Sequence, residues 1–516
     1  MKTTRRSVAF MALLLAVCLL LSCAMAENQR EIDTSRDSVT IAYNKAVDNF
    51  SPMSSLVEQG TASMIFEPLF RRDDRGNFYP RIAKSWEWIT PTTLHVVLND
   101  DVYDTAGNHI TTSDVVFTLS ERIDPGNNTT FIDYTNCELI SETEMNIPML
   151  ASAQEAILNT LASMYIVDED AYTASEDNMS LTPIGCGPYM LTEHVSNSHC
   201  ILTFNENWHL KTEEPQIKTV KVMFITDAQQ RLNVLRSHEV DYAYGLDFNY
   251  LDILNKEPNI VPMVKTIDNQ LGLYFNMQSE LFKDNYKLRQ AICYAINNAA
   301  VSMINKKGMA PVAKAIGVQH GAAYTETFTA AIEEMVSDTN YYEYNLEKAK
   351  ELIAEAGVPK GTTIRFLYFT TAGMDTLAKV LMGSLQEIGL TLELDLQQNS
   401  SSYAAKLFSP EGYDLTPLSL ESNPLDTWFQ VSANTWNMSK LPPEKLAPIA
   451  AKVNAAFVAT GADREAALLE LEKIYYDNLY AYAIYDDVGL AACYDNVDPW
   501  MFTFLHPDYT KWVIYK

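Results

Sequence analysis

The 516-residue sequence is short of positive charge: 38 Lys and Arg stand against 66 Asp and Glu, giving a formal net charge of −28. Binding to nucleic-acid phosphates needs basic patches, and this composition leaves little material to build them. We therefore expect no nucleic-acid partner, and the excess of acid is typical of a soluble protein. Apolar content of 47% with 20% charged residues indicates a globular chain rather than a disordered or fibrous one.

Residues that carry catalysis or bind metals are also poorly represented. The seven cysteines and eight histidines form no C-x-x-C pair and no H-E-x-x-H spacing. There is no G-x-S-x-G elbow, and no carboxylate spacing picks out an acid/base pair. We expect no metal, no cofactor and no enzymatic activity, with a secreted hydrolase as the alternative from another function class.

Cysteine pairing is left open by the sequence. Cys186 and Cys200 flank a predicted hairpin. They either form a disulfide, which would contribute about 3 kcal/mol, or remain as buried free thiols.

Only the start of the chain has a long hydrophobic run. Three basic residues precede the apolar stretch from Val8 to Leu21, which is the layout of a secretory signal peptide. Two cleavage sites compete. Leu-Leu-Ser-Cys at 20–23 resembles a lipobox, which would remove residues 1–22 and leave a lipidated Cys23, whereas Ala-Met-Ala at 24–26 fits ordinary cleavage after 26. We favour the lipoprotein, tethered to the outer face of the cell membrane, over a free periplasmic protein.

Three motifs follow one another in the first quarter of the chain. They are Phe-Glu-Pro-Leu-Phe at 66–70, Pro-Arg-Ile-Ala-Lys-Ser-Trp-Glu at 80–87, and a segment at 104–117 that runs from a Gly-Asn turn into a helix. Thr112, Ser113 or Asp114 is expected to cap that helix. Residues 93–98 alternate in polarity, which predicts a strand with one buried face.

Later segments continue the ordered series. Pro-Ile-Gly-Cys-Gly-Pro-Tyr at 183–189 predicts a tight loop before a strand. Residues 282–297 form an amphipathic helix pattern. The stretch 345–357 reads as a helix with an Asn cap and a terminal Gly, followed by strand, helix and strand to residue 396, so this region is predicted to be a mixed α/β lobe.

Taken in this order, the motifs resemble family 5 of the extracellular solute-binding proteins of ABC importers, which bind oligopeptides, dipeptides or nickel complexes. That family shows "LA-x-SW", a strand, "DG-x-x-x-T-A-x-DV" and later "P-x-G-x-G-P-Y". The sequence departs from the pattern at Glu239, where Gly is usual, and at Asn297, where Asp is usual. The resemblance covers about residues 38–516.

The resemblance implies an α/β, two-lobed periplasmic-binding-protein-like fold (class II, large type) with an extra domain inserted in the first lobe. Residues 38–70, 184–278 and 489–516 would form the discontinuous first lobe, 71–183 the insert and 279–488 the second lobe. It also implies a monomer that captures a peptide or similar small solute in the cleft by hinge closure and delivers it to ABC permease subunits in the membrane.

Peptide-binding members of the family hold the ligand's amino terminus with an acid in a "W-x-x-D-Y-x-x-P" segment. Here the matching stretch, 413–424, lacks the Trp, and Glu421 is the nearest acid, one position displaced relative to Pro424. Glu421, with its neighbour Asn423, either binds a ligand ammonium group or is a solvated loop carboxylate. A nickel chelate or an oligosaccharide is the alternative ligand.

Six further residues are candidates, the first four of them by position. Tyr43 with Asn44, and Phe275 with Asn276, lie at strand ends where the resembled family lines its cleft. Trp428 and Trp436 either stack on a ligand or pack in the core, as most tryptophans do.

Overall fold

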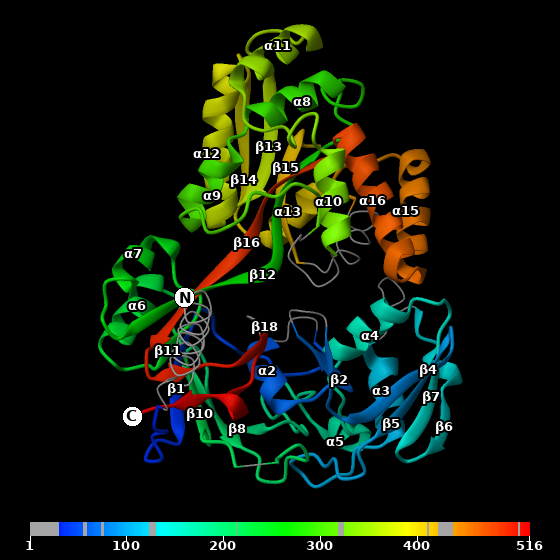
Figure 1. Cartoon of the computed structure of the whole chain (residues 1–516), viewed down its shortest axis with the longest axis vertical. Helices are drawn as coiled ribbons and strands as arrows, with labels where there is room; N and C mark the ends of the chain where they lie inside the picture. The colour runs from blue at the N-terminus through cyan, green and yellow to red at the C-terminus, as the bar shows by residue number, and fades with distance from the viewer. Residues whose placement is uncertain are drawn as a thin grey trace, which may run out of the picture.

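The computed structural model of the chain describes residues 30–54, 59–73, 77–122, 131–212, 214–317, 325–409, 412–421, 437–503 and 506–516. Figure 1 shows two lobes joined by a pair of long strands. We call the half that contains both ends of the described chain the lower lobe and the other half the upper lobe. Within the described ranges, no helix is long and apolar enough for a membrane crossing.

A ten-stranded sheet runs through both lobes in the order β14-β13-β15-β12-β16-β11-β1-β10-β9-β8. Its strands are β1 (Ser38–Tyr43), β8 (Tyr189–Val195), β9 (His199–Phe204), β10 (Thr219–Phe224), β11 (Tyr242–Ala243), β12 (Ile260–Phe275), β13 (Thr363–Phe369), β14 (Thr391–Gln397), β15 (Leu415–Glu421) and β16 (Ala481–Tyr494). One sheet therefore connects the two hydrophobic interiors.

The crossing strands are β12 and β16. They pair antiparallel from Ile260 opposite Tyr494 in the lower lobe to Tyr274 opposite Ala481 in the upper lobe. The register shifts between Thr266 and Gln270. Because a bulge interrupts the ladder and bends the strand, this shift is the natural place for the lobes to change their angle.

The parallel strands of both lobes end at the space between the lobes. In the lower lobe, β1 is parallel to β10 and β11, and β11 is antiparallel to β16, which descends from the upper lobe. In the upper lobe, β15 is antiparallel to the ascending β12 and parallel to β13, which is parallel to β14. Three strands therefore ascend to the cleft and three descend to it.

Helices cover the sheet in each lobe. Those of the lower lobe are α2 (Gln59–Ile65), α6 (Ala228–Arg236), η3 (Phe248–Tyr250) and α7 (Leu251–Leu254); those of the upper lobe are α8 (Tyr286–Ala295), α9 (Asn298–Lys306), α10 (Glu326–Met335), α11 (Leu346–Ala356), α12 (Ala372–Glu387), α13 (Ser400–Leu407), α15 (Pro443–Val458) and α16 (Gly461–Asn478). As predicted, the side chain of Asn345 caps α11, and Gly357 ends it at φ 67°.

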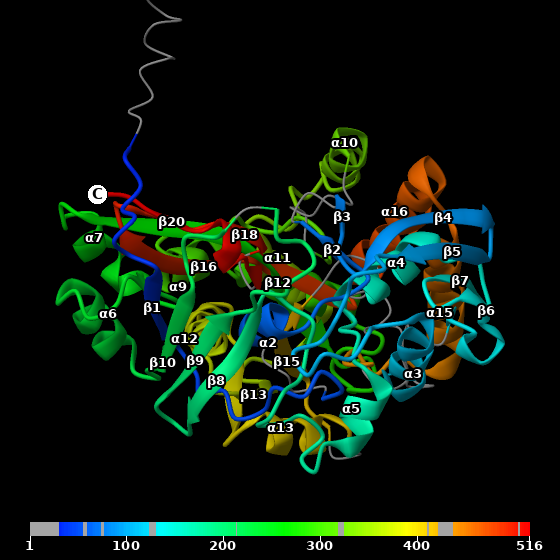
Figure 2. The same ribbon diagram turned by 90° about the horizontal axis from the view of Figure 1, so that it is seen from below.

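A separate four-stranded sheet extends the lower lobe on the side away from α6 and α7 (Figure 2). It has the order β4 (Ala83–Thr90), β5 (Thr93–Leu98), β7 (Glu144–Pro148) and β6 (Glu138–Ser141), and is accompanied by α3 (Thr112–Arg122), α4 (Gln154–Ser163) and α5 (Glu169–Ala174). As predicted, β5 buries every second residue. This sheet includes the middle motif found in the sequence.

The capping prediction for α3 was only partly right. The helix begins at Thr112, so the position before it belongs to Thr111 rather than to any of the three predicted caps. Asp114 nevertheless serves the helix start, because its Oδ2 accepts from Thr111 N at 2.7 Å and from Thr111 Oγ1 at 2.8 Å. This is the reaching-back half of a capping box.

The lobes also meet on the side opposite the crossing strands. There α15 of the upper lobe contacts α4, which accompanies the four-stranded sheet of the lower lobe. The rings of Phe131 and Phe457 lie 5.8 Å apart across this contact. The crossing strands and this aromatic contact therefore join the two lobes at opposite sides of the molecule in Figure 1.

Of the two alternatives for the cysteines, the structure has the free thiols. Cys186 and Cys200 are both buried and unbridged. Burial raises the pKa of the Cys186 thiol to about 12, so this thiol is protonated and unreactive at neutral pH.

The last part of the chain forms three short pieces beside α2. They are the pair β17 (Val497–Asp498) with β20 (Val513–Ile514), the hairpin β18 (Met501–Thr503) with β19 (His506–Pro507), and the turn η4 (Tyr509–Lys511). The two described ends lie together, since Ile32 bridges Tyr515 and Lys516 N donates to Glu31 O at 2.9 Å. A further hairpin, β2 (Phe70–Arg72) with β3 (Phe78–Pro80), follows α2.

Candidate ligand-binding cleft

The lower wall of the cleft is built where β1 and β11 end. Tyr43 closes β1 and stacks on Tyr244, with ring centroids 5.2 Å apart and planes at 28°. Asn44 follows and packs on Gly245, which has a φ of +65°; a Cβ there would come within 2.6 Å of Asn44 Nδ2. Glycine is required at 245 because both the backbone angle and the close side chain exclude other residues.

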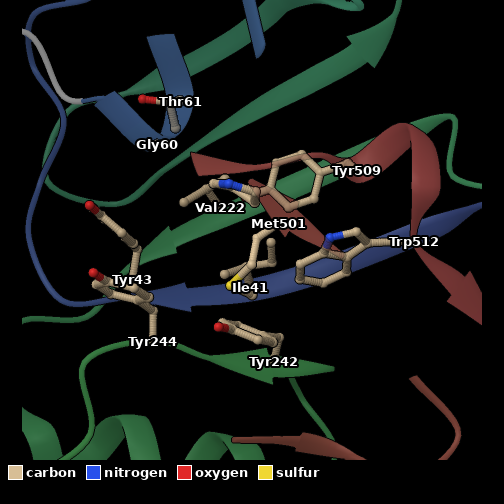
Figure 3. A pocket seen from close by; sticks show the side chains of 11 residues that line it. Ile41, Tyr43, Gly60, Thr61, Val222, Tyr242, Tyr244, Met501, Tyr509 and Trp512 are labelled. Atoms are coloured by element: carbon tan, nitrogen blue, oxygen red, sulfur yellow. The ribbon is translucent and has the colours of Figure 1, made fainter. Parts of the chain in front are cut away.

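A cavity of about 30 Å³ lies beside this tyrosine pair (Figure 3). It is lined by Ile41, Tyr43, Gly60, Thr61, Val222, Tyr242, Tyr244, Met501, Pro507, Tyr509 and Trp512. The lining thus combines residues of β1, β10 and β11, the start of α2 and the last segment of the chain. The cavity lies over the face of the sheet close to the carboxyl ends of these strands, the region outside which open α/β sheets bind ligands.

Buried charges fix the segments that surround the cavity. Glu67 Oε2 lies 3.1 Å from Arg71 Nε and 3.5 Å from Arg81 Nε. Arg81 Nη2 lies 3.8 Å from Asp508 Oδ2, and both guanidinium groups face the ring of Phe502. The first motif of the sequence and the last turn of the chain are therefore joined by one cluster, and Glu67 has a structural role there.

The pKa values within this cluster follow the balance of burial and charge. Burial lowers the pKa of Arg81, although Glu67 opposes the shift. For Arg71, burial again lowers the pKa, but Glu67, Tyr165 and Asp508 together outweigh it, so the pKa of Arg71 is raised. Burial, helped by Arg71, lowers the pKa of His506 to about 4, so His506 is neutral at pH 7.

The upper wall is formed by polar residues at strand ends and helix starts. Thr371 follows β13 and caps α12, its Oγ1 accepting from Met374 N at 3.2 Å. Asn399 follows β14 and caps α13 in a complete capping box. This wall therefore presents hydrogen-bonding groups and the positive ends of two helices.

At the cleft end of β15, the backbone of Glu421 pairs with that of Asn269 on the crossing strand β12. The side-chain oxygen Oδ1 of Asn269 is buried, and it receives no hydrogen bond from any residue that the structure describes. A buried acceptor without a donor costs about 1–3 kcal/mol, so this oxygen is suited to receive a donor from a ligand.

The predicted site residues fall into three groups. Tyr43 and Asn44 lie together in the lower wall. Phe275 and Asn276 lie at the far end of β12 from the cleft, inside the upper lobe: Phe275 is fully buried, 5.3 Å from the ring of Phe282. Their position follows from the strand direction, since β12 rises about 20 Å between the register shift and its end.

The amide of Asn276 is used within the lobe, because Nδ2 donates to Tyr413 O at 2.6 Å and Oδ1 accepts from Gln278 N at 2.9 Å. We therefore leave Phe275 and Asn276 out of the site proposed below. The remaining predictions, Asn423, Trp428, Trp436, Cys23 and the side chain of Glu421, lie outside the described residues.

Several cleft residues were missed from the sequence. Tyr242, Tyr244, Met501, Tyr509 and Trp512 all line the cavity. The signal for the first two was present, since Asp-Tyr-Ala-Tyr-Gly at 241–245 places tyrosines next to a strand end. Within the described ranges, no group of three or more His, Cys, Asp or Glu side chains is placed to hold a metal ion.

Comparison with known proteins gives the same architecture. Among solved structures, the putative peptide-binding protein AppA from Clostridium difficile superimposes with a TM-score of 0.80 at 18% identity, covering 92% of this chain and 100% of that one. This likeness shows the two-lobed periplasmic-binding-protein fold.

Sequence relatives agree. The glutathione-binding protein GsiB of Escherichia coli K12 is 24% identical over 388 residues, 73% of this chain and 70% of the relative. The nickel-binding periplasmic protein of the same strain is 24% identical over 395 residues, 71% of this chain and 72% of the relative.

Residues 77–439, more than half of the chain, match the family described as bacterial extracellular solute-binding proteins, family 5 middle. The order of motifs, the crossing strands and the cleft all fit this match. The chain belongs to family 5 of the bacterial extracellular solute-binding proteins, the extracytoplasmic receptors of ABC importers.

Proposed function

We propose that the protein captures a short peptide between its lobes and passes it to an ABC permease. The observation that supports a peptide most directly is Asn269 Oδ1, a buried acceptor without a donor among the described residues, next to the backbone of Glu421. An ammonium group carries three N–H donors, and the free amino terminus of a peptide is such a group. Asn269 and Glu421 would hold it together.

Closure follows from the register shift in the crossing strands. A ligand closes the lobes only if it binds the closed state better than the open one. A peptide that contacts Tyr43 on the lower wall and Asn269 on the upper wall meets this condition, because both contacts exist together only when the lobes approach. In this proposal the protein does no covalent chemistry.

The peptide class agrees with what the comparisons name: AppA is described as a putative peptide-binding protein and GsiB as glutathione-binding. A nickel chelate is the second candidate, because another relative is described as a nickel-binding periplasmic protein. We further propose that the protein works as a monomer and that a lipidated Cys23 tethers it to the outer face of the membrane.

The first test is ligand-dependent thermal shift with a tripeptide pool, nickel–histidine and oligosaccharides, together with mass spectrometry of any ligand that co-purifies. A peptide-specific rise in the melting temperature is expected. If only the nickel chelate or a sugar raises it, the peptide proposal is wrong. Turnover of a chromogenic ester or glycoside without any shift would favour the hydrolase instead.

The second test concerns the ammonium site. Glu421→Gln and Asn269→Ala should each weaken binding of free tripeptides by roughly tenfold, because each loses a hydrogen bond to a charged group. Binding of amino-acetylated tripeptides should change little. Glu347→Gln is the matched control, since its carboxylate is 82% exposed on α11. Equal losses for free and acetylated peptides would remove both residues from this role.

A further inference from the structure

One hydroxyl group in the cavity of the lower wall has no partner. Tyr242 lines the cavity, is only 4% exposed, and its Oη makes no hydrogen bond with any residue in the described part of the chain. Its ring is held 5.2 Å from that of Trp512. In Figure 3 the hydroxyl oxygen of Tyr242 points away from Trp512, to the side where Met501 and Tyr244 lie.

Because burial raises the pKa of Tyr242 well above its ordinary value, the phenol keeps its proton. It can therefore both donate and accept a hydrogen bond. The oxygen itself is accessible from the cavity, since it is not one of the described side-chain atoms that are both buried and without a partner. Tyr242 therefore offers an unused hydrogen-bonding group to a small polar group that enters the cavity.

The cavity is small. At about 30 Å³, it holds roughly two water-sized groups, since one such group needs about 10–15 Å³. A water molecule would need two to four polar partners, whereas most of this lining is carbon. A short side chain with one polar end fits better, because its carbon contacts the aromatic rings and its end reaches Tyr242.

We propose that this cavity is a side-chain subsite for the bound peptide, which takes a side chain of about two heavy atoms ending in a hydroxyl or thiol that hydrogen-bonds Tyr242 Oη. Serine and cysteine are the residues of this size and chemistry. The subsite rests on the proposed peptide-binding function and adds to it the choice of side chain. Leucine and phenylalanine are excluded by volume, because the stacked pair Tyr43 and Tyr244 stands at one wall.

Calorimetry with tripeptides that carry Ser, Cys, Ala, Leu or Phe at each position in turn tests the subsite. At one position, Ser and Cys should bind about 3–10 times more tightly than Ala, the factor of one neutral hydrogen bond. Leu and Phe at that position should bind more weakly than Ala. Two positions that favour neither Ser nor Cys are expected, because they contact other parts of the cleft.

Tyr242→Phe separates the hydroxyl from the shape of the cavity. It should bring the Ser and Ala peptides to within about twofold of each other while leaving the affinity for the Ala peptide almost unchanged. Tyr344→Phe is the matched control, because Tyr344 is 42% exposed on the upper lobe. Circular dichroism and the melting temperature of the unliganded variant establish that it is folded.

Met501→Ala tests the size limit independently, because Met501 is only half-buried and its truncation enlarges the cavity. It should improve binding of the Leu peptide relative to the Ser peptide by about tenfold. If peptides bind but no position prefers Ser or Cys, or if Tyr242→Phe keeps the preference, the subsite is wrong and the peptide-binding function stands. If no peptide binds at all, both fail.

Discussion

The lower lobe buries an acid between two arginines beside its cleft wall, whereas one acid of the upper lobe, Glu472, is buried near tyrosines without an ion-pair partner among the described residues. In the lower lobe, Glu67 faces Arg71 and Arg81. In the upper lobe, Glu472 is 2% exposed and makes no ion pair within the described ranges; its Oε2 accepts from Ile316 N at 3.0 Å. Burial raises the pKa of Glu472 well above its ordinary value, so it is neutral.

This difference has a physical consequence for each lobe. A buried ion pair depends on both partners remaining, since removing one leaves an uncompensated charge. A buried neutral acid destabilises the folded state only when it loses its proton. We therefore expect the lower lobe to be fragile to substitution and the upper lobe to be sensitive to alkaline pH, and the following predictions test this contrast.

The largest effect is expected from Glu67→Gln. It leaves two buried guanidinium groups without their shared carboxylate and should lower the free energy of unfolding by about 3–5 kcal/mol. Urea denaturation measures this. The control in the upper lobe is Glu355→Gln, which breaks the half-exposed pair with Lys287 and should cost less than about 1 kcal/mol. Similar losses for both variants would contradict the contrast.

The next effect is the pH dependence of the two lobes, which should have opposite signs. The pKa of His506 is lowered to about 4 by burial, so below pH 6.5 the unfolded chain binds a proton that the folded chain does not. Its contribution to stability is present above pH 6.5 and falls by about 3 kcal/mol as the pH drops to 4.

Glu472 acts in the other direction. Its pKa is raised in the folded state, so its contribution is present below about pH 4.5 and is lost as the pH rises. Unfolding measured from pH 4 to 8 should show that His506→Asn reduces the loss of stability on the acidic side, and that Glu472→Gln reduces the loss of stability toward pH 8. If either variant keeps the pH profile of the original protein, the residue replaced in it is not the source of that pH dependence.

A smaller effect is expected on binding. Tyr43→Ala removes one ring of the stacked pair in the lower wall and should weaken peptide binding by roughly tenfold, because aromatic anchors contribute about 1–2 kcal/mol. Tyr344→Ala on the upper lobe should leave binding unchanged. Calorimetry measures the peptide affinity of both variants. A lower melting temperature without a loss of affinity in Tyr43→Ala would make Tyr43 a purely structural residue.

The smallest effect concerns the helix starts. Thr371→Ala removes the cap of α12 in the upper lobe, and Asp227→Ala removes the cap of α6 in the lower lobe. Each should cost about 1 kcal/mol of unfolding free energy. Thr371 lies at the cleft, whereas Asp227 lies outside the cavity lining. Thr371→Ala is therefore the only one of these two variants that should change ligand affinity.

Much of the fold was predictable from the sequence because local signals and element order agree. The alternation at residues 93–98 gave a strand with one buried face, and the Asn cap and Gly stop at 345 and 357 gave a helix. The domain boundaries proposed from the resemblance stay predictions. The order of motifs identified the family although each motif alone is ordinary.

The candidate site was predicted less well, because it depends on which end of a strand reaches the cleft. Phe275 and Asn276 were chosen as a strand end, yet β12 ascends and carries them away from the cleft. Tyr43 was chosen by the same rule, and β1 ends at the cleft. Met501 and Trp512 were missed because the resemblance returned residues 489–516 to the first lobe without indicating that these two side chains lie beside α2.

The position of the two described ends has a mechanical consequence. Ile32 bridges Tyr515 in the lower lobe, and within the described ranges β12 and β16 carry the chain into and out of the upper lobe. A membrane tether attached near either described end would therefore fix the lower lobe relative to the membrane. If the lobes close as proposed, the upper lobe is then the half that moves, and a label near either described end would report on the lower lobe.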